Sequence, residues 1–258
     1  MSLYFPPSLR VDFEPRLGGQ STWQDHAAFG YDLVAAKAPR LLVELGSQRG
    51  FSFGVFCQSA RTHSLDCTCY AVDTWAGDEH TGSYGEEIYD KLASHIREYY
   101  RHYAYLLRMT FDEAVGQFSD GSIDLLHIDG LHTYEAVSHD FHTWYPRVAA
   151  GGVILFHDIA ERQGDFGVWK LWEELQQQHP CFTFKHGHGL GVLRKPGGVE
   201  LADEPQLIQL LFGGSAEDRQ TVAEMYSIAG QFLKNRRQAR KFREGREQAI
   251  KRKMTGQA

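Results

Sequence analysis

Apolar and polar positions in the central part of the chain alternate as in a strand, a helix and a second strand. Two apolar runs, Ile123–Ile128 and Val153–Phe156, have the length of buried strands. Between them, Tyr134–Tyr145 places apolar side chains at helical spacing, and the Gly151-Gly152 pair predicts a turn before the second strand. The pattern therefore predicts a βαβ unit.

The polar residues that follow these two strands are the first candidates for chemistry. The strands of a βαβ unit are parallel, so both end at the same edge of the sheet. Ligands bind at that edge in open α/β sheets. Asp129 and His132 follow the first strand, and His157 and Asp158 end the second. We expect these four side chains to lie close together.

Strands and helices alternate through the rest of the chain as well. The expected strands are Arg40–Leu45, Cys67–Val72, Ala104–Arg108, Cys181–Lys185 and Gly191–Arg194. The expected helices cover residues 21–37, 51–61, 86–100, 111–118 and 165–178. The last two strands flank a glycine turn and predict a hairpin. The chain is therefore predicted to be an α/β protein with a doubly wound, Rossmann-like and mostly parallel sheet.

Both ends of the chain differ from this pattern. Residues 1–20 are rich in proline and glycine and predict an irregular arm. At the other end, residues 197–258 form a predicted helical extension, in which residues 216–253 lack proline and favour one long helix. This helix either lies on the body or pairs with a second subunit to form a homo-oligomer. A linker to another domain and a contact with an anionic surface remain the alternatives.

Charge separates the C-terminal segment from the body. Residues 234–258 hold 10 Lys and Arg against 2 Asp and Glu, which is a net charge of +8. Residues 1–233 hold the other 17 basic and 31 acidic residues, which is a net charge of −14. The two parts together give the net charge of −6 of the whole chain. An acidic body argues against a nucleic-acid-binding domain. No apolar run approaches the ~20 residues of a membrane span, and the first residues lack the pattern of a signal peptide. We expect a cytoplasmic protein.

The four cysteines, Cys57, Cys67, Cys69 and Cys181, fit this location. We interpret them as small core residues of a reducing compartment. A metal pair at Cys67 and Cys69 is the alternative, although no second Cys or His pair has suitable spacing.

The turn after the first strand has the plan of a nucleotide site. A strand leads through a glycine turn into a helix, and an acid, Asp73, ends the next strand. The turn has only two glycines, Gly46 and Gly50, where a dinucleotide site has three, and the carboxylate of Glu44 precedes it. This suits a ligand without phosphates that carries an amino group and a sulfonium. A tight turn with incidental glycines is the alternative.

Several stretches over residues 20–196 together resemble a class I S-adenosylmethionine-dependent methyltransferase, of the methyltransferase domain 24 type and its macrocin-like branch of sugar O-methyltransferases: VELGSQRGFS, YAVDTW, RMTFDEAV, LLHIDGLHTYEAVSHDF and GGVILFHD. The resemblance implies a seven-stranded sheet with one antiparallel strand over residues 21–196. It also implies S-adenosylmethionine as the cofactor. The motifs are more specific for the cofactor than for the substrate.

The resemblance implies that Glu44, Gly46 and Ser47 contact the methionine part of the cofactor and that Asp129 lies beneath the sulfonium. It implies that Asp73 contacts the ribose. It also implies that Thr74 and Trp75 lie beside the nucleoside and that Met109 and Thr110 border the adenine. His132 resembles the general base of the family, although a histidine bonded to Asp129 or Asp158 is the alternative. Mg²⁺ or Mn²⁺ on Asp129 and Asp158 is implied too, with His157 either a third ligand or a contact to substrate.

The loop over residues 75–84 is interpreted as a lid over the substrate, with a solvated surface loop as the alternative. Asp78 and His80 could reach a polyhydroxyl acceptor, and Tyr84 could stack on a sugar ring. We therefore predict an O-methyltransferase acting on a hydroxyl of a sugar, glycoside or related small molecule. The alternative is a non-catalytic cofactor-binding or assembly module that interacts through its C-terminal helix. An NAD-dependent enzyme is a poorer choice, because the dinucleotide glycine pattern is absent.

Overall fold

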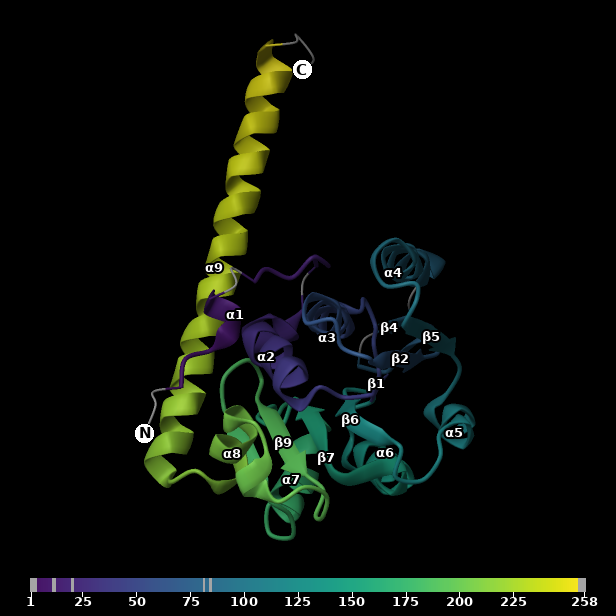
Figure 1. Ribbon diagram of the computed structural model, residues 1–258. Helices are drawn as coiled ribbons and strands as arrows, with labels where there is room; N and C mark the ends of the chain where they lie inside the picture. The colour runs from purple at the N-terminus through teal and green to yellow at the C-terminus, as the bar shows by residue number, and fades with distance from the viewer. Residues whose placement is uncertain (1–3, 11–12, 20, 81, 84, 255–258) are drawn as a thin grey trace.

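A seven-stranded sheet in the order β5-β2-β1-β6-β7-β9-β8 runs through the computed structural model (Figure 1). The structure describes residues 4–10, 13–19, 21–80, 82–83 and 85–254, and it describes the side chains of all of these except residues 10, 78 and 248–254. The strands are β1 Leu41–Leu45, β2 Thr68–Asp73, β5 Ala104–Arg108, β6 Ile123–Ile128, β7 Val148–His157, β8 Cys181–Phe184 and β9 Leu190–Arg194. Only β9 runs antiparallel, and it pairs with both β7 and β8. The predicted doubly wound sheet with one antiparallel strand is confirmed.

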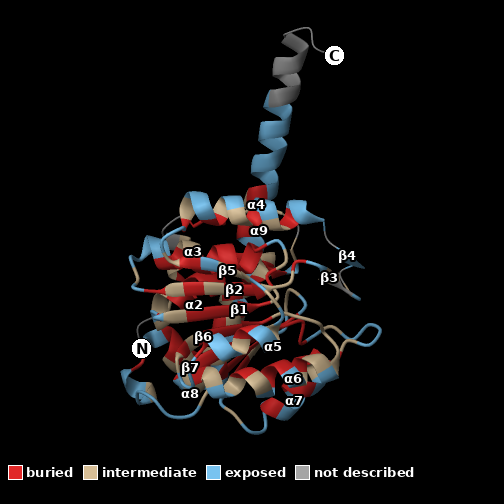
Figure 2. Cartoon of the chain, turned by 90° about the vertical axis from the view of Figure 1, so that its right-hand side faces the viewer, coloured by how far each residue is buried: buried red, intermediate tan, exposed pale blue. Residues whose placement is uncertain are grey.

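Helices cover both faces of the sheet (Figures 1 and 2). One layer contains α2 Ala27–Lys37, α3 Phe51–Thr62, α4 Glu86–Tyr99 and α8 Gln206–Gly213, and the other contains α5 Phe111–Ala114, α6 Tyr134–Trp144 and α7 Val168–Leu175. The pleat of β1 explains the two layers, because successive side chains point to opposite faces. Leu42 packs with the first layer and Val43 with the second. Both are fully buried, as expected for the centre of a parallel sheet.

Strand β7 begins five residues earlier than the apolar run predicts. It pairs with β6 at Val148, and the pairing then shifts register before Val153 meets Leu125. Gly151, at φ +74°, adopts a conformation that favours glycine, so the Gly151-Gly152 pair forms an irregularity within the strand. The prediction that these glycines form a turn before the strand was wrong.

Short elements were also missed. A hairpin of β3 Gly77–Asp78 and β4 Gly82–Ser83 lies within the expected loop. The expected irregular arm contains the one-turn helix α1 Pro7–Arg10. A 3₁₀ helix, η1 Thr22–His26, precedes α2 and begins at the cap Ser21, whose hydroxyl accepts a hydrogen bond from the Trp23 backbone amide.

The C-terminal helix α9 Ala216–Met254 is long, as predicted, and only part of it lies on the body (Figures 1 and 2). Val222, Tyr226, Ala229 and Leu233 are buried at helical spacing against the core formed by α2, α3 and α8. The rest of α9 projects beyond the domain. Among the described residues, no helix combines the length and the apolar character that a membrane span requires.

The cysteines have the placement predicted for core residues. Cys57, Cys67 and Cys69 are buried, and Cys181 is half-buried. All four are free thiols. The Sγ atoms of Cys67 and Cys69 lie 3.6 Å apart.

Candidate active site

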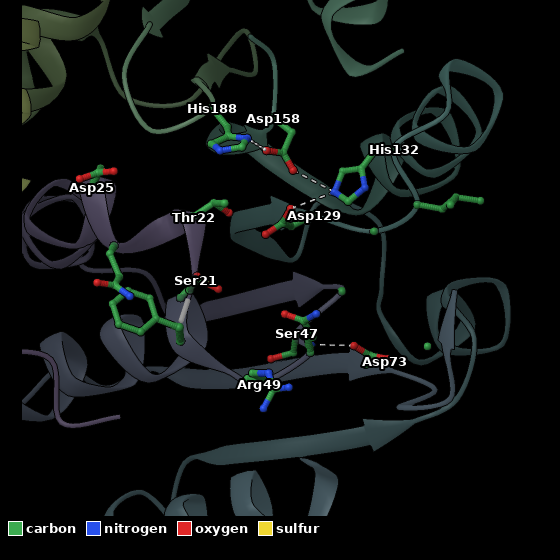
Figure 3. A pocket seen from close by; sticks show the side chains of 18 of the residues that line it. Ser21, Thr22, Asp25, Ser47, Arg49, Asp73, Asp129, His132, Asp158 and His188 are labelled. Carbon is green, nitrogen blue, oxygen red and sulfur yellow. Dashed lines mark hydrogen bonds and ion pairs between the residues drawn. The ribbon is translucent and has the colours of Figure 1, made fainter. Parts of the chain in front are cut away.

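A cavity of about 1020 Å³ lies at the carboxyl edge of the parallel strands (Figure 3). Residues at the ends of β1, β2, β6 and β7 form its floor, namely Gly46, Ser47, Asp73, Asp129 and Asp158. Segments outside the sheet complete the wall, among them η1 and α9. Its position is the one at which open α/β sheets bind ligands.

The glycine turn after β1 brings the backbone of two strands close together. Gly46 has φ +84°, and a Cβ at this position would lie 2.1 Å from the Asp129 carbonyl oxygen. Only glycine fits this close approach. Gly50, at φ +74°, then starts α3. The first glycine therefore places the turn directly beside the end of β6.

Glu44 lies under this turn and not in the cavity. Its carboxylate is fully buried and accepts hydrogen bonds from the Ser47 hydroxyl (2.7 Å) and from Nδ1 of His127 (2.9 Å). Nε2 of His127 accepts a hydrogen bond from the Trp23 indole (3.1 Å), so the imidazole proton resides on Nδ1. The structure thus gives Glu44 a supporting position, in which it orients Ser47 at the cavity surface.

Asp73 ends β2 and faces the cavity with a fixed orientation. Its two carboxylate oxygens accept hydrogen bonds from the backbone amides of Gln48 (2.8 Å) and Trp75 (2.7 Å). Burial raises the pKa of Asp73, and these hydrogen bonds oppose that rise. Carboxylate oxygens have further lone pairs, so the group can still accept hydrogen bonds from a ligand.

The other residues expected around a nucleoside divide into two groups. Thr74 and Thr110 line the cavity, and Phe111 beside them was missed. Trp75 is buried, with its indole donating to the Gln48 carbonyl oxygen (2.9 Å), and it does not line the cavity. Met109 does not line it either, and its backbone amide donates to the Asp73 carbonyl oxygen.

The polar residues after β6 and β7 lie close together, as predicted from the parallel strands. Nε2 of His132 is 3.0 Å from Oδ2 of Asp158 and 3.6 Å from Oδ1 of Asp129. Nδ1 of the buried His157 is 3.4 Å from Oδ1 of Asp129 and 3.3 Å from Oδ2 of Asp158. Both carboxylates therefore lie between two imidazoles.

Charge explains the protonation of this group. Burial alone lowers the pKa of His132, but the hydrogen bonds and charges of Asp129 and Asp158 more than offset it and raise the pKa to about 9. The same balance raises the pKa of His157 to about 10. Burial alone would raise the pKa of Asp158. The hydrogen bonds and charges of the two histidines outweigh this effect of burial and lower the pKa of Asp158 to about 2. At neutral pH the group consists of two carboxylates and two imidazolium ions.

Three of these side chains have a geometry that suits a divalent ion. One ligand atom from each of Asp129, His132 and Asp158 can be chosen so that all three lie within 4.8 Å of one another. Two carboxylates and one imidazole fit Mn²⁺ better than Mg²⁺, which prefers oxygen ligands. His157 lies behind the carboxylates, where Nε2 donates to the Gly187 carbonyl oxygen (3.2 Å) and Nδ1 faces the two aspartates.

The expected lid reaches the site through His80. Nδ1 of His80 lies 3.2 Å from Nδ1 of His132, and its Nε2 lies 2.9 Å from Oδ1 of Asp165. The rings of His80 and His132 both stack on Phe166. His80 thus contacts the candidate base. The Asp78 side chain and Tyr84 lie outside the described residues.

Several cavity residues come from segments that the sequence did not associate with the site. These are Ser21, Thr22, Gln24 and Asp25 at η1, and Lys234 and Gln238 on α9. His188, in the turn between β8 and β9, also lines the cavity, with Nδ1 3.6 Å from Oδ1 of Asp158. Contacts of this kind depend on packing between segments far apart in the chain.

Comparison with known sequences gives a family match over the centre of the chain. Residues 43–159 match the family described as "Methyltransferase domain". An uncharacterized protein of Sinorhizobium fredii is 48% identical over 173 residues, which cover 67% of this chain and 19% of that protein. An uncharacterized protein of Acanthamoeba polyphaga mimivirus is 30% identical over 125 residues, which cover 46% of this chain and 51% of that protein. The chain therefore spans about a fifth and about half of these two curated relatives.

Solved structures share the fold at low sequence identity. The O-methyltransferase TomG from Streptomyces achromogenes, involved in tomaymycin synthesis and solved with S-adenosylmethionine, has a TM-score of 0.52 and 13% identity over 74% of this chain and 86% of that chain. A protein of Staphylococcus aureus described as a caffeoyl-CoA O-methyltransferase has a TM-score of 0.52 and 12% identity over 73% and 89%. These structures show that the chain shares their fold, and residues 43–159 match a methyltransferase domain family.

Proposed function

We propose that this chain is an S-adenosylmethionine-dependent O-methyltransferase. One arrangement carries the proposal, namely that the glycine turn, Asp73 and the Asp129–His132–Asp158 group line one cavity. In this assignment Asp73 binds the ribose hydroxyls. Gly46 and Ser47 border the methionine part, and Thr74 and Thr110 border the nucleoside. Glu44, Trp75 and Met109 support this surface from behind.

The reaction is a displacement at the methyl carbon. A hydroxyl oxygen of the acceptor forms a bond to this carbon while the carbon–sulfur bond breaks and the electron pair stays on sulfur, which leaves S-adenosylhomocysteine. The protein aligns the two reactants, which contributes up to roughly 7–11 kcal/mol in well-oriented pairs. Neutral His132 takes the hydroxyl proton, and Asp158, 3.0 Å from Nε2, stabilises the imidazolium that forms.

We further propose that Mg²⁺ or Mn²⁺ binds at Asp129 and Asp158, with His157 behind them, where it would favour the deprotonated acceptor. Two carboxylates held close together are suited to this role. His157 holds both of them in place through its Nδ1 contacts. The positive charge of the ion would stabilise the two carboxylates in place of part of the positive charge that the histidines supply.

The proposed acceptor is a sugar, a glycoside or a related small molecule. Most of the residues that line the cavity are polar, and His80 contacts the candidate base directly. Asp78 and Tyr84 remain predicted substrate contacts of the lid. We also propose a cytoplasmic location and a division into an arm (residues 1–20), a methyltransferase domain (residues 21–196) and a helical extension (residues 197–258).

A second candidate function is an assembly module that binds the cofactor and interacts through α9. This helix exposes Ile228, Phe232 and Phe242, which are 69%, 52% and 74% exposed. Such side chains on a projecting helix favour a contact with another subunit, and hence a homo-oligomer. Light scattering of the full chain and of a variant in which Ile228, Phe232 and Phe242 are replaced by serine tests this candidate, since an unchanged oligomeric state would argue against it.

Transfer of a labelled methyl group tests the proposed activity. The chain is incubated with S-adenosylmethionine labelled in the methyl group and with a panel of glycosides and phenols, and the products are separated. We expect label in an acid-stable, base-stable ether. His132→Ala should reduce the rate by about 10²–10⁴-fold, the usual contribution of a general base. His142→Ala is the matched control, because His142 is exposed on α6 and bonds only within that helix. Equal rates for both variants would remove His132 from the mechanism.

A further inference from the structure

Helix α9 forms part of the cavity wall, although it lies outside the matched methyltransferase family region of residues 43–159. Lys234 and Gln238, one helical turn apart, both line the cavity. Gln231 and Lys241, before and after this turn, are exposed and do not line it. The contact with the cavity is therefore made by a single turn of α9.

Close contacts hold this turn in position. A Cβ on Gly230 would lie 2.0 Å from the Asp25 carbonyl oxygen, so glycine allows α9 to lie directly on η1. Nζ of Lys234 then lies 3.1 and 3.3 Å from the two carboxylate oxygens of Asp25. The Tyr226 hydroxyl donates to the buried Asp32 (3.0 Å) one turn before Gly230. Further along the helix, Arg240 pairs with Glu14 at 2.8 Å.

The Asp25–Lys234 pair faces the part of the cavity remote from the nucleoside side. Figure 3 shows Asp25 and Asp73 on opposite sides of the view, with Asp129 and His132 in its upper half. If Asp73 binds the ribose and the methyl group lies beside His132, then the cofactor extends from Asp73 toward the base. The remaining space beside η1 and α9 is then left for the acceptor.

The side chains on this wall match hydroxyl groups. A hydroxyl both donates and accepts hydrogen bonds. Asp25 offers acceptors, Lys234 offers donors, and the amide of Gln238 offers both. The side chains of Asp25 and Lys234 are 20% and 35% exposed, so each retains accessible polar atoms while the pair fixes their position. Neighbouring hydroxyls of a sugar ring can use a donor and an acceptor that lie 3.1 Å apart.

We infer that Lys234 and Gln238 of α9, together with Asp25 of η1, form the part of the acceptor site that binds the hydroxyl groups of a saccharide. This inference rests on the proposed function. It makes the C-terminal helix a determinant of substrate specificity in addition to any role in assembly. Lys234 and Gln238 bind the substrate and take no part in the transfer step.

The test uses the full chain saturated with S-adenosylhomocysteine. Binding of methyl α-D-mannopyranoside, methyl β-D-glucopyranoside and methyl α-L-rhamnopyranoside is measured by saturation-transfer NMR. The variants are Lys234→Met and Gln238→Ala. Lys241→Met and Gln231→Ala are the matched controls, because both residues are exposed on the same helix and lie outside the cavity. Calorimetry gives the affinity of each protein for S-adenosylhomocysteine.

We expect Lys234→Met to bind at least one glycoside about tenfold more weakly, the effect of losing one charged hydrogen bond, and Gln238→Ala to bind it about threefold more weakly, the effect of losing a neutral one, while the controls bind it as the wild type does. Affinity for S-adenosylhomocysteine should stay unchanged in all four variants.

Equal glycoside binding by all proteins, or no glycoside binding by the wild-type complex, would overturn the inference and leave the proposed activity standing. A loss of cofactor affinity in the cavity variants would overturn it too, because α9 would then contact the cofactor. Absence of S-adenosylhomocysteine binding by the wild type would instead contradict the proposed function.

Discussion

Nε2 of His132 lies 3.0 Å from Oδ2 of Asp158, which joins the segment after β6 to the end of β7. The contact orients the imidazole at the edge of the sheet. It also stabilises the protonated form, and together with Asp129 it raises the pKa of His132 to about 9 against the opposing effect of burial. A base of this kind is protonated at neutral pH unless another positive charge replaces its proton.

The pH dependence of methyl transfer follows from this pKa. The base form of His132 is neutral, so its fraction grows as the pH rises toward 9. We expect kcat/KM, measured in a chelator, to rise by about tenfold per pH unit below that value and then to level off. Asp158→Asn removes one of the groups that raise the pKa, so its profile should level off at lower pH. A wild-type profile that is flat above pH ~6.5, the ordinary pKa of histidine, would contradict this assignment.

Metal binding is testable by thermal unfolding of the chelated protein. A ligand that binds only the folded state raises the melting temperature, so Mn²⁺ should raise it for the wild type and should raise the activity above the residual level measured in EDTA. Asp158→Asn should abolish both effects. Asp112→Asn is the matched control, because Asp112 is exposed and also pairs with a histidine, His139, at 2.8 Å. A melting temperature that Mn²⁺ leaves unchanged, together with full activity in EDTA, would exclude the metal.

A separate pH effect on stability is expected from Asp32. Burial raises its pKa from 3.8 to about 7, although hydrogen bonds from Ser8 and Tyr226 oppose the rise. The folded state therefore binds a proton that the unfolded state has released between these two values. From this group alone, stability should fall by about 1.4 kcal/mol per pH unit as the pH rises through that interval.

Urea unfolding of the wild type and Asp32→Asn at about pH 5, 6 and 8, below and above the raised pKa, measures this effect. The free energy of unfolding of the variant, relative to the wild type, should increase with pH, because the amide cannot release a proton. A difference that is independent of pH would show that Asp32 does not titrate in this range. The contact with Tyr226 would then hold α9 equally well at each pH.

Much of the fold and part of the site follow from the sequence because they depend on local pattern and strand direction. Apolar runs predicted the strands, and parallel strands bring Asp129 and Asp158 to one edge wherever the helices lie. The glycine turn and Asp73 likewise come from adjacent strands, which pair in register from Leu41 to Leu45.

Other features depend on which side chains face each other across the fold. Glu44 lies opposite His127 in the pairing of β1 with β6, so its carboxylate has a buried partner and does not face the cavity. His127 lies inside an apolar run, and this was the signal that could have indicated such a partner. Lys234 reaches the cavity from the C-terminal helix by its contact with Asp25, and local pattern carries no information on a pairing so distant in the chain.

Calorimetric titration with S-adenosylhomocysteine tests the central claim most directly, namely that the cavity binds the cofactor through Asp73. We expect saturable binding to a single site on the wild type and at least about tenfold weaker binding to Asp73→Ala, since charged hydrogen bonds to the ribose would be lost. A wild-type protein that is folded and releases no heat of binding, or an Asp73→Ala variant that binds with unchanged affinity, would contradict the account.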